Sequence, residues 1–450
     1  MSRIVRTRRG RALAPAQAIV LGFGLTLVIG TALLLLPLST APGSRTTVVD
    51  ALFTATSAVS VTGLVVVDTG SHWSGFGLAV ILLLIQLGGL GIMVVATLVG
   101  IALARRLSMR ARMATVVETK TAVAPNVRRI VGGIFVTSIS IEAVVALILF
   151  IRILTGYGYG VGEAAWFSVF HAVSAFNNAG FALQADSMMG FASDGWLLLP
   201  MCAAIIIGGI GFPVLRELRR EIRHPLHWSM NTRIVLAATA ALLALGTIAV
   251  TVMEWSNPAT LGSADPGTRI LGGFFHAVQT RTAGFNSVDI GAMHDETWLV
   301  TDILMFIGGG PAGTAGGIKV TTFAVLFFIL WTELRGGTAV NIFGKRLARG
   351  VHRQAISVVL LAIAAIVVVT LAILAMTDLD LDQVLFEVVS AFGTVGLSTG
   401  ITSDLPEPAR VLIVMLMFMG RLGPLTLGTA LALKERRAAY ELPKERPAIG

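Results

Sequence analysis

Four segments of the chain resemble one another, and their repetition decides the fold. They read Phe53-TATSAVSVTG-Leu64, Phe170-HAVSAFNNAG-Phe181, Phe275-HAVQTRTAG-Phe285 and Phe386-EVVSAFGTVG-Leu397. Their glycines, Gly63, Gly180, Gly284 and Gly396, lie 117, 104 and 112 residues apart, and the third segment is one residue shorter than the others. Self-similarity at such spacing predicts an architecture of four like units.

The surroundings of these segments are strongly apolar. Of the 450 residues, 55 % are hydrophobic and 13 % are charged, too few charges to cover a soluble protein of this size. A membrane-crossing helix needs about 20 mostly apolar residues. Stretches of this kind recur along the chain, at 18–36, 76–104, 130–154, 196–215, 234–253, 355–376 and 411–433. The sequence therefore predicts a multi-pass membrane protein.

The distribution of charge predicts how the chain crosses the membrane. Most of the 34 Lys and Arg residues lie in five clusters, at 3–11, 105–129, 216–233, 335–353 and 434–446. By the positive-inside rule, these clusters and both termini are cytoplasmic. Each of the four segments then lies on the outer side, between two long apolar stretches. Two crossings in each unit give all four units the same orientation, so that they can surround a pore.

The stretch before each glycine is too short to span a bilayer and suits a helix that enters the membrane partway. Asp265-Pro266 is a helix start signal in the third unit, and Asp380 or Asp382 can cap the helix of the fourth. Such helices point the negative ends of their dipoles inward. Glycine then allows backbone carbonyls to turn toward a dehydrated cation.

The predicted fold is an all-α membrane protein. It has four parallel repeats of helix, pore helix with loop, and helix, in a pseudo-fourfold arrangement around one central pore. The predicted boundaries are a cytoplasmic N-terminal tail at 1–14, repeats at 15–105, 106–222, 223–336 and 337–434, and a cytoplasmic C-terminal tail at 435–450.

The second helix of the third repeat is predicted to be broken within the membrane. Between two apolar halves, 297–307 and 318–331, the chain reads Gly308-GGPAGTAG-Gly317, with six glycines and one proline. A regular helix cannot continue through them, at about 1 kcal/mol for each glycine and 3 kcal/mol for proline. Irregular backbone at this depth lines a cavity or lies buried in protein. A phosphate-binding loop is disfavoured because the spacing does not match GxxxxGK[ST].

A few polar residues in apolar stretches need separate interpretation. Arg421 lies in the last span, where an arginine faces a cavity or a partner, or reaches for the membrane surface. His171 and His276 have no spaced ligands for a metal site, so packing or hydrogen bonding is expected. Glu142, Glu254 and Asp302 are isolated in the sequence. No acid/base pair or nucleophile motif emerges, and no enzyme is predicted.

Over residues 15–435 the chain resembles the Trk/Ktr/HKT superfamily of potassium transporters. It is most similar to the Ktr-type membrane subunits, because a single long apolar stretch precedes the first glycine segment. The resemblance implies a potassium-binding selectivity filter built from backbone carbonyls, with Gly63 in place of serine favouring potassium over sodium. The filter residues are Val61, Thr62, Gly63, Asn178, Ala179, Gly180, Thr282, Ala283, Gly284, Thr394, Val395 and Gly396.

The resemblance also implies a gate below the filter and partners outside it. The gating residues are Gly308, Gly309, Gly310, Gly313, Thr314, Gly316, Gly317, Lys319 and Arg421. It implies a homodimer in the cell membrane, in contact with lipids, that docks on a cytosolic nucleotide-binding regulatory ring of the KtrA/TrkA type. No cofactor bound by this chain and no nucleic acid are expected. Potassium is the transported ion, and whether sodium is coupled stays open.

Two alternatives to potassium transport remain. A secondary transporter of an organic solute, such as an amino acid, would account for the broken helix but not for four parallel pore loops. A membrane enzyme would need clustered catalytic side chains, which the sequence does not show.

Overall fold

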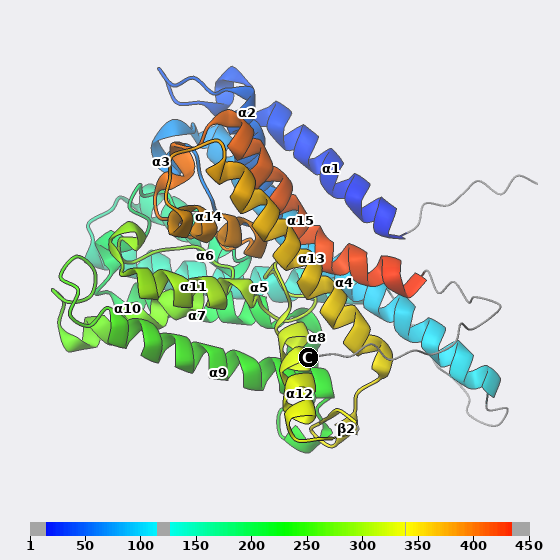
Figure 1. The fold of residues 1–450 in the computed structure, drawn as a ribbon. Helices are drawn as coiled ribbons and strands as arrows, with labels where there is room; N and C mark the ends of the chain where they lie inside the picture. Colours follow the sequence, from blue (N-terminus) through cyan, green and yellow to red (C-terminus); the bar gives the residue numbers. More distant parts are fainter. Residues whose placement is uncertain (1–14, 115–126, 338, 434–450) are drawn as a thin grey trace, which may run out of the picture.

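The computed structural model describes residues 15–114, 127–337 and 339–433, and almost all of its regular structure is α-helical (Figure 1). The all-α class predicted from the sequence is confirmed. The predicted tails, 1–14 and 435–450, lie outside the described residues, as do residues 115–126 of the basic segment 105–129.

The helices group around the four glycine segments. In the first unit α1 (Pro15–Leu34), α2 (Val48–Ser60) and the short α3 (Thr69–His72) precede α4 (Gly75–Ala114). The second unit has α5 (Val127–Gly156), α6 (Val161–Phe176), α7 (Gly195–Ile210) and α8 (Phe212–Glu221). The third has α9 (Met230–Met253), α10 (Pro266–Gln279), α11 (Asp295–Phe306) and α12 (Val320–Leu334). The fourth has α13 (Arg349–Leu374), α14 (Leu381–Gly393) and α15 (Glu407–Leu433).

Short elements connect these helices. In the described ranges the 3₁₀ turns are η1 (Pro37–Ser39), η2 (Met189–Phe191), η3 (Pro225–His227), η4 (Ile290–Ala292) and η5 (Ile401–Ser403). A two-stranded antiparallel hairpin, β1 (Asn341–Ile342) and β2 (Lys345–Arg346), lies between α12 and α13.

Several helices are long and apolar enough to cross a membrane. In the part of the chain described, four pass on length and composition: Gly75–Thr97, Arg128–Gly156, Met230–Met253 and Gly350–Leu374. The pair α7 and α8 is a fifth if its two halves, bent by 98°, form one span. The sequence had predicted one continuous stretch at 196–215, and this is wrong. The helix breaks at Gly211, whose φ of 98° lies outside the helical range, and Pro213 follows in the first turn of α8.

Two of the four short helices that precede the glycines, α2 and α10, begin with a side-chain cap. Asp265 caps α10 as predicted, accepting hydrogen bonds from the backbone N–H of Gly267 at 2.9 Å and of Thr268 at 3.1 Å. Asp380 occupies the N-cap position of α14 but its side chain makes no capping bond. Helix α2 begins with a capping box of Thr47 and Asp50, which satisfies two N–H groups reciprocally.

The units pack in a closed order. Helix α4 contacts α5 and α6, α7 contacts α10, and α11 contacts α14. The last helix, α15, then packs on α1 and α2 of the first unit, as Figure 1 shows for its red and blue segments. Neighbouring units are therefore in contact around the whole molecule, and the four pore helices lie inside this arrangement.

Candidate ion pathway

The four glycine segments meet one another in cyclic order. At each glycine an added Cβ would lie within 3.0 Å of a carbonyl oxygen in the next unit, and the φ angles of the four glycines lie between 70° and 95°. The pairs are Gly63 with Ala179, Gly180 with Ala283, Gly284 with Val395, and Gly396 with Thr62. The sites predicted from four distant parts of the sequence thus form one ring, in which each position has room only for glycine.

A second left-handed residue precedes each glycine by two positions. The φ angle is 55° at Val61, 60° at Asn178, 69° at Thr282 and 51° at Thr394. This region is unfavourable for β-branched residues, and such backbone persists only where the surrounding structure imposes it, often at functional sites. The segments Val61–Gly63, Asn178–Gly180, Thr282–Gly284 and Thr394–Gly396 share this left-handed backbone, which is strained at the three β-branched residues but accessible to asparagine. We call them the glycine segments.

A side chain from each pore helix supports the chain behind its glycine segment. Ser57 Oγ accepts from the N–H of Gly63 at 3.0 Å, and Ser390 Oγ accepts from the N–H of Gly396 at 3.1 Å. In the second unit Ser174 Oγ donates to the carbonyl of Phe181 at 2.9 Å. The third unit is one residue shorter and has Gln279 instead, whose Oε1 accepts from the N–H of Phe285 at 3.1 Å. The longer side chain compensates for the shorter segment.

The pore helices end immediately before the glycine segments. Helices α2, α6, α10 and α14 have 13, 16, 14 and 13 residues, too short to span a bilayer. Their last residues are Ser60, Phe176, Gln279 and Gly393. Four helix C-termini, each with the partial negative charge of its dipole, are therefore followed by the four segments of one ring.

The predicted break in the third unit is confirmed. Helix α11 ends at Phe306 and α12 begins at Val320. Between them the glycine-rich loop, Gly308–Lys319, closes at its base. The N–H of Gly308 donates to the carbonyl of Ile318 at 2.8 Å, and that of Val320 donates to the carbonyl of Gly309 at 2.9 Å.

The loop docks on the bend between α7 and α8. Gly310 N–H donates to the carbonyl of Gly209 at 2.7 Å, and Thr314 N–H donates to that of Gly208 at 3.1 Å. In return Phe212 N–H donates to the carbonyl of Ala312 at 3.2 Å. The break at Gly211 frees the backbone groups that receive the loop, so the two interrupted helices satisfy each other.

Side chains also tie the loop to its surroundings. Thr314 Oγ1 lies 2.8 Å from the side-chain amide of Asn178, in the second glycine segment. Arg421, only 3 % exposed, donates through Nη1 to the carbonyl of Thr314 and through Nη2 to that of Gly88 at 3.2 Å. Lys319 Nζ donates to the carbonyl of Ala315 at 2.5 Å. Of the two basic residues predicted at the gate, Arg421 therefore contacts the loop from α15, and Lys319 makes a hydrogen bond within the loop.

Arg281 is a further buried cation that the sequence interpretation missed. It directly precedes the third glycine segment and is 7 % exposed. Its Nη2 donates to the carbonyl of Gly308 at 3.1 Å and lies 3.5 Å from Thr239 Oγ1. The signal was visible in the third segment, because it alone among the four carries an arginine.

A cavity of about 300 Å³ lies beside the loop. Pro311, Ala312 and Gly313 of the loop line it, together with Lys319, Arg421 and residues of α4, α12 and α13. None of the glycine segments contributes to this lining. The loop therefore contacts the second glycine segment through Thr314 and also borders a cavity that two cationic side chains line.

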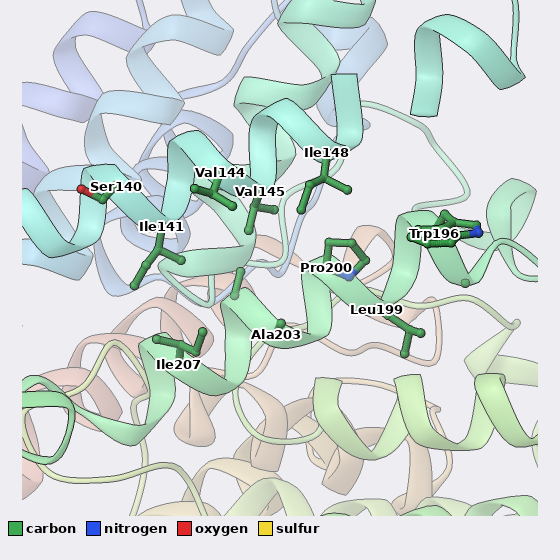
Figure 2. Close-up of a pocket in the computed structure, with 12 residues that line it drawn as sticks. Ser140, Ile141, Val144, Val145, Ile148, Trp196, Leu199, Pro200, Ala203 and Ile207 are labelled. Atoms are coloured by element: carbon green, nitrogen blue, oxygen red, sulfur yellow. The ribbon is translucent and has the colours of Figure 1, made fainter. Parts of the chain in front are cut away.

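A larger hollow lies elsewhere and has a different character. The groove between α5 and α7 has a volume of about 830 Å³ and is lined by apolar side chains apart from Ser140 (Figure 2). Trp196 on its rim is 75 % exposed. Figure 2 shows Val144 and Ile148 of α5 on one side of the groove and Pro200 and Ala203 of α7 on the other. Such a surface suits contact with lipid chains, and it offers no ligands for an ion.

The two histidines of the pore helices make local hydrogen bonds. His171 Nδ1 lies 2.8 Å from the carbonyl of Phe167, and His276 Nε2 lies 3.0 Å from Thr301 Oγ1. Within the described ranges, no group of three or more His, Cys, Asp or Glu side chains could hold a metal ion.

Together these features define a class of protein, a multi-pass helical membrane protein built for transport. Four short helices lead to four glycines, each of which closely approaches a backbone carbonyl of the next unit. The chain belongs to the TrkH family of cation transport proteins, whose family model matches residues 16–441.

Comparisons with individual proteins agree. The chain is 41 % identical to the Ktr system potassium uptake protein B of Bacillus subtilis, over 94 % of each chain. It is 38 % identical to the protein of the same name in Vibrio alginolyticus, over 93 % of this chain and 91 % of that one. It is 34 % identical to the potassium/sodium uptake protein NtpJ of Enterococcus hirae, over 99 % of this chain and 100 % of that one. The crystal structure of the potassium transporter TrkH from Vibrio parahaemolyticus shares the fold, with a TM-score of 0.74 over 96 % of this chain and 87 % of that chain, at 18 % identity.

Proposed function

We propose that this chain is the potassium-translocating membrane subunit of a Ktr/Trk-type uptake system. Potassium ions cross the cell membrane through a pore between the four repeats predicted above. The observation that carries this proposal is the cyclic contact of Gly63, Gly180, Gly284 and Gly396 with carbonyls of the neighbouring units. Rings of backbone carbonyls replace the hydration shell of potassium, and the relatives are potassium uptake proteins by name.

The selectivity filter in this proposal consists of the four glycine segments. Each contributes three residues with a left-handed first and third position. Coordination of the ion by carbonyl oxygens needs no charged side chain. The backbone of the segments is held by hydrogen bonds of four side chains, those of Ser57, Ser174, Gln279 and Ser390. Sodium is the competing ion, because one relative is a potassium/sodium uptake protein.

The gate in this proposal is the glycine-rich loop, with Lys319 and Arg421. Two observations support this role. The loop contacts the second glycine segment and borders the cavity of about 300 Å³. It is held in place by individual hydrogen bonds to neighbouring elements and is not part of a regular helix. The positive charges of Lys319 and Arg421 also raise the electrostatic barrier to a cation on this side.

The assembly follows the same proposal. The chain forms a homodimer in the cell membrane with both termini in the cytoplasm, and a cytosolic nucleotide-binding ring regulates it. The exposed arginines of α8, Arg216, Arg219 and Arg220, offer a basic surface for such a partner. The native mass of the purified chain, alone and with a nucleotide-binding subunit added, tests both points.

The decisive experiment is rubidium uptake into liposomes that contain the purified chain. Saturable uptake that potassium competes away and sodium competes weakly supports the proposal. An inward sodium gradient that drives rubidium against its own gradient identifies a coupled carrier, whereas equilibration alone identifies a channel. Absence of rubidium uptake by folded protein, together with uptake of an amino acid, would favour the organic-solute alternative.

A further inference from the structure

Arg281 occupies an unusual position for a charged side chain. It is 7 % exposed and lies two residues beyond the end of α10, in a structure of apolar helices. Its hydrogen-bond partners in the described part of the chain are the carbonyl of Gly308 and, more distantly, the hydroxyl of Thr239. Ionisable residues inside a membrane protein are costly and commonly pair with backbone carbonyls where they have a function.

The acceptor belongs to the base of the glycine-rich loop. In a continuous helix, the carbonyl of Gly308 would accept from the N–H four residues further on, but the chain leaves the helix after Phe306. The base is pinned by the paired bonds from Gly308 to Ile318 and from Val320 to Gly309. A group that holds Gly308 therefore holds both ends of the loop.

The four repeats provide an internal comparison. The residue just before each glycine segment is Ser60, Asn177, Arg281 or Gly393. The charged one is in the third unit, whose second helix is interrupted by the glycine-rich loop. The charged residue therefore occurs in the unit that has the loop, and the other three segments form without a charge at this position.

We propose that Arg281 is a positioning residue that anchors the base of the glycine-rich loop to the third glycine segment and so keeps the loop across the ion path. This inference rests on the proposed role of the loop as a gate. Arg421 holds the middle of the loop at Thr314 and Arg281 holds its base at Gly308. If the whole loop moves, both contacts must break. If only its middle moves, the contact with Arg421 breaks and Arg281 keeps the base in place.

The test is a comparison of variants with and without the loop. Rubidium uptake is measured in liposomes for the wild type, Arg281→Gln, a deletion of Gly310–Thr314, and the combination of both changes. A hydrogen bond from a charged donor is stronger than a neutral one, so its loss is expected to raise uptake roughly tenfold with the loop intact. With the loop deleted, Arg281→Gln should add nothing. The ratio of rubidium to sodium uptake should stay unchanged in both backgrounds.

Each other outcome has a distinct meaning. If deletion of Gly310–Thr314 leaves rubidium uptake unchanged, the loop is not a gate, and the inference about Arg281 loses its basis. If the deletion raises uptake and Arg281→Gln does not, the anchor is refuted while the gate stands. If Arg281→Gln lowers the rubidium to sodium ratio equally with and without the loop, Arg281 supports the filter and not the loop, which also refutes the anchor.

Two further variants protect the test against misfolding. Arg281→Lys keeps a positive charge and a donor, and should raise uptake less than Arg281→Gln, again only with the loop present. Arg269→Gln is the matched control, because Arg269 lies in the first turn of α10, in the same unit, and also donates to backbone carbonyls, those of Ala264, Trp255 and Gly262. Its uptake should equal that of the wild type. A rise as large as that of Arg281→Gln would contradict a specific anchor.

Discussion

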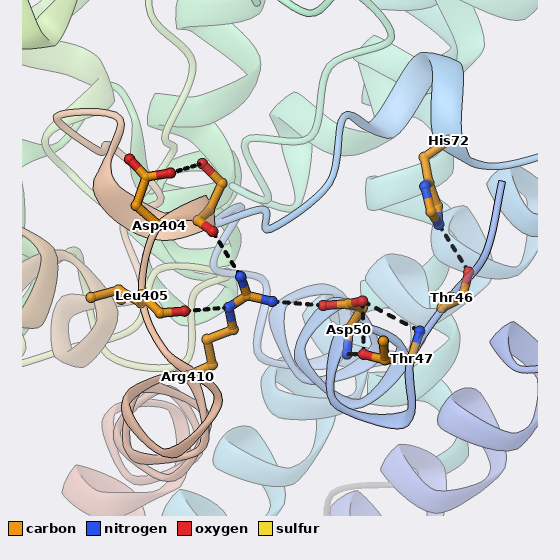
Figure 3. A network of polar contacts seen from close by, with 8 residues as sticks. Thr46, Thr47, Asp50, His72, Asp404, Leu405 and Arg410 are labelled. Atoms are coloured by element: carbon orange, nitrogen blue, oxygen red, sulfur yellow. Dashed lines mark hydrogen bonds and ion pairs between the residues drawn. The ribbon is translucent and has the colours of Figure 1, made fainter. Parts of the chain in front are cut away.

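Arg410 Nη1 lies 2.9 Å from Asp50 Oδ1, and this ion pair joins residues 360 positions apart in the chain (Figure 3). Arg410 lies in the first turn of α15 and also donates to the carbonyls of Leu405 at 2.8 Å and Ser403 at 2.7 Å. Asp50 lies in the first turn of α2 and accepts from Thr47 Oγ1 at 2.7 Å. The pair thus connects the fourth unit to the pore helix of the first, where the circle of units closes.

Removal of this pair should destabilise the protein. Asp50→Asn keeps an acceptor for the Thr47 cap but loses the charge opposite Arg410. Because both side chains are largely buried, the expected loss is about 1–2 kcal/mol, or roughly 2–4 °C in the unfolding temperature of the detergent-solubilised protein. Asp265→Asn, at an exposed cap of α10, is the control and should change it less. Asp50→Asn and Arg410→Gln should not be additive, and full additivity would mean that the pair contributes no coupling.

The broad fold could be predicted because it depends on composition and repetition. Apolar stretches, basic clusters and four similar segments indicated an all-helical membrane protein, and the run from Gly308 to Gly317 predicted the broken helix. The ion pair of Asp50 and Arg410 could not be foreseen, since no local pattern shows which distant side chains meet. The break at Gly211 was not predicted because residues 196–215 form a long apolar run. A single glycine and a single proline within such a run, Gly211 and Pro213, are a weaker signal than the six glycines of the loop.

Gly63→Ser is expected to weaken the preference for potassium over sodium. The Cβ of a serine at this position would lie within 3.0 Å of the carbonyl oxygen of Ala179, and its backbone would have to adopt a φ of 90°. The ring must then distort, and about a tenfold loss in the rubidium to sodium uptake ratio is expected, equivalent to roughly 1.4 kcal/mol. Gly43→Ser is the matched control, since Gly43 has a φ of 89° but no heavy atom within 4 Å of an added Cβ. An unchanged ratio for Gly63→Ser would argue against a filter at this ring.

Arg421→Gln should raise rubidium uptake. The change removes a positive charge from the cavity beside the loop and weakens the bonds to the carbonyls of Thr314 and Gly88. Loss of bonds from a charged donor predicts at least about a tenfold rise. Arg233→Gln is the control, because Arg233 is also an arginine that donates to two carbonyls, those of Pro225 and Leu226, but outside this region. Reduced uptake by folded Arg421→Gln protein would contradict a barrier role.

The candidate site was predicted unevenly, and the reasons are physical. The glycines could be found because positive φ and close backbone approach leave few alternatives to glycine. The shorter third segment seemed irregular in the sequence, and only the structure explains it through the reach of Gln279. Arg281 was not predicted because the shared pattern of the four segments is a glycine with its neighbouring backbone carbonyls, and a side chain present in one segment alone is not part of that pattern. Glu254 seemed isolated because its partners are hydroxyl, amide and backbone groups, which carry no charge pattern.

Glu254 is expected to stabilise the connections that follow α9. It is fully buried, and its carboxylate accepts from Thr297 Oγ1 at 2.5 Å, Thr260 Oγ1 at 2.6 Å, Asn257 Nδ2 at 2.7 Å and the N–H of His294 at 3.0 Å. Burial by itself would raise the pKa of Glu254, but these hydrogen bonds outweigh it and hold the pKa below its usual value. Glu254→Gln replaces one acceptor oxygen with a donor that faces other donors, and should cost about 3 kcal/mol.

The pH dependence gives this prediction a specific signature. Because the pKa is lower in the folded state than in the unfolded one, the carboxylate contributes its full stability above the unfolded pKa of about 4.3 and loses it as the pH falls through the folded value. The difference in unfolding temperature between wild type and Glu254→Gln should therefore be constant from pH 8 to about pH 5.5 and shrink in more acidic solution. Glu296→Gln, at an exposed position in the first turn of α11, should show a small difference throughout. A wild-type advantage that grows on acidification would mean that Glu254 is protonated in the folded protein, contrary to its hydrogen bonds.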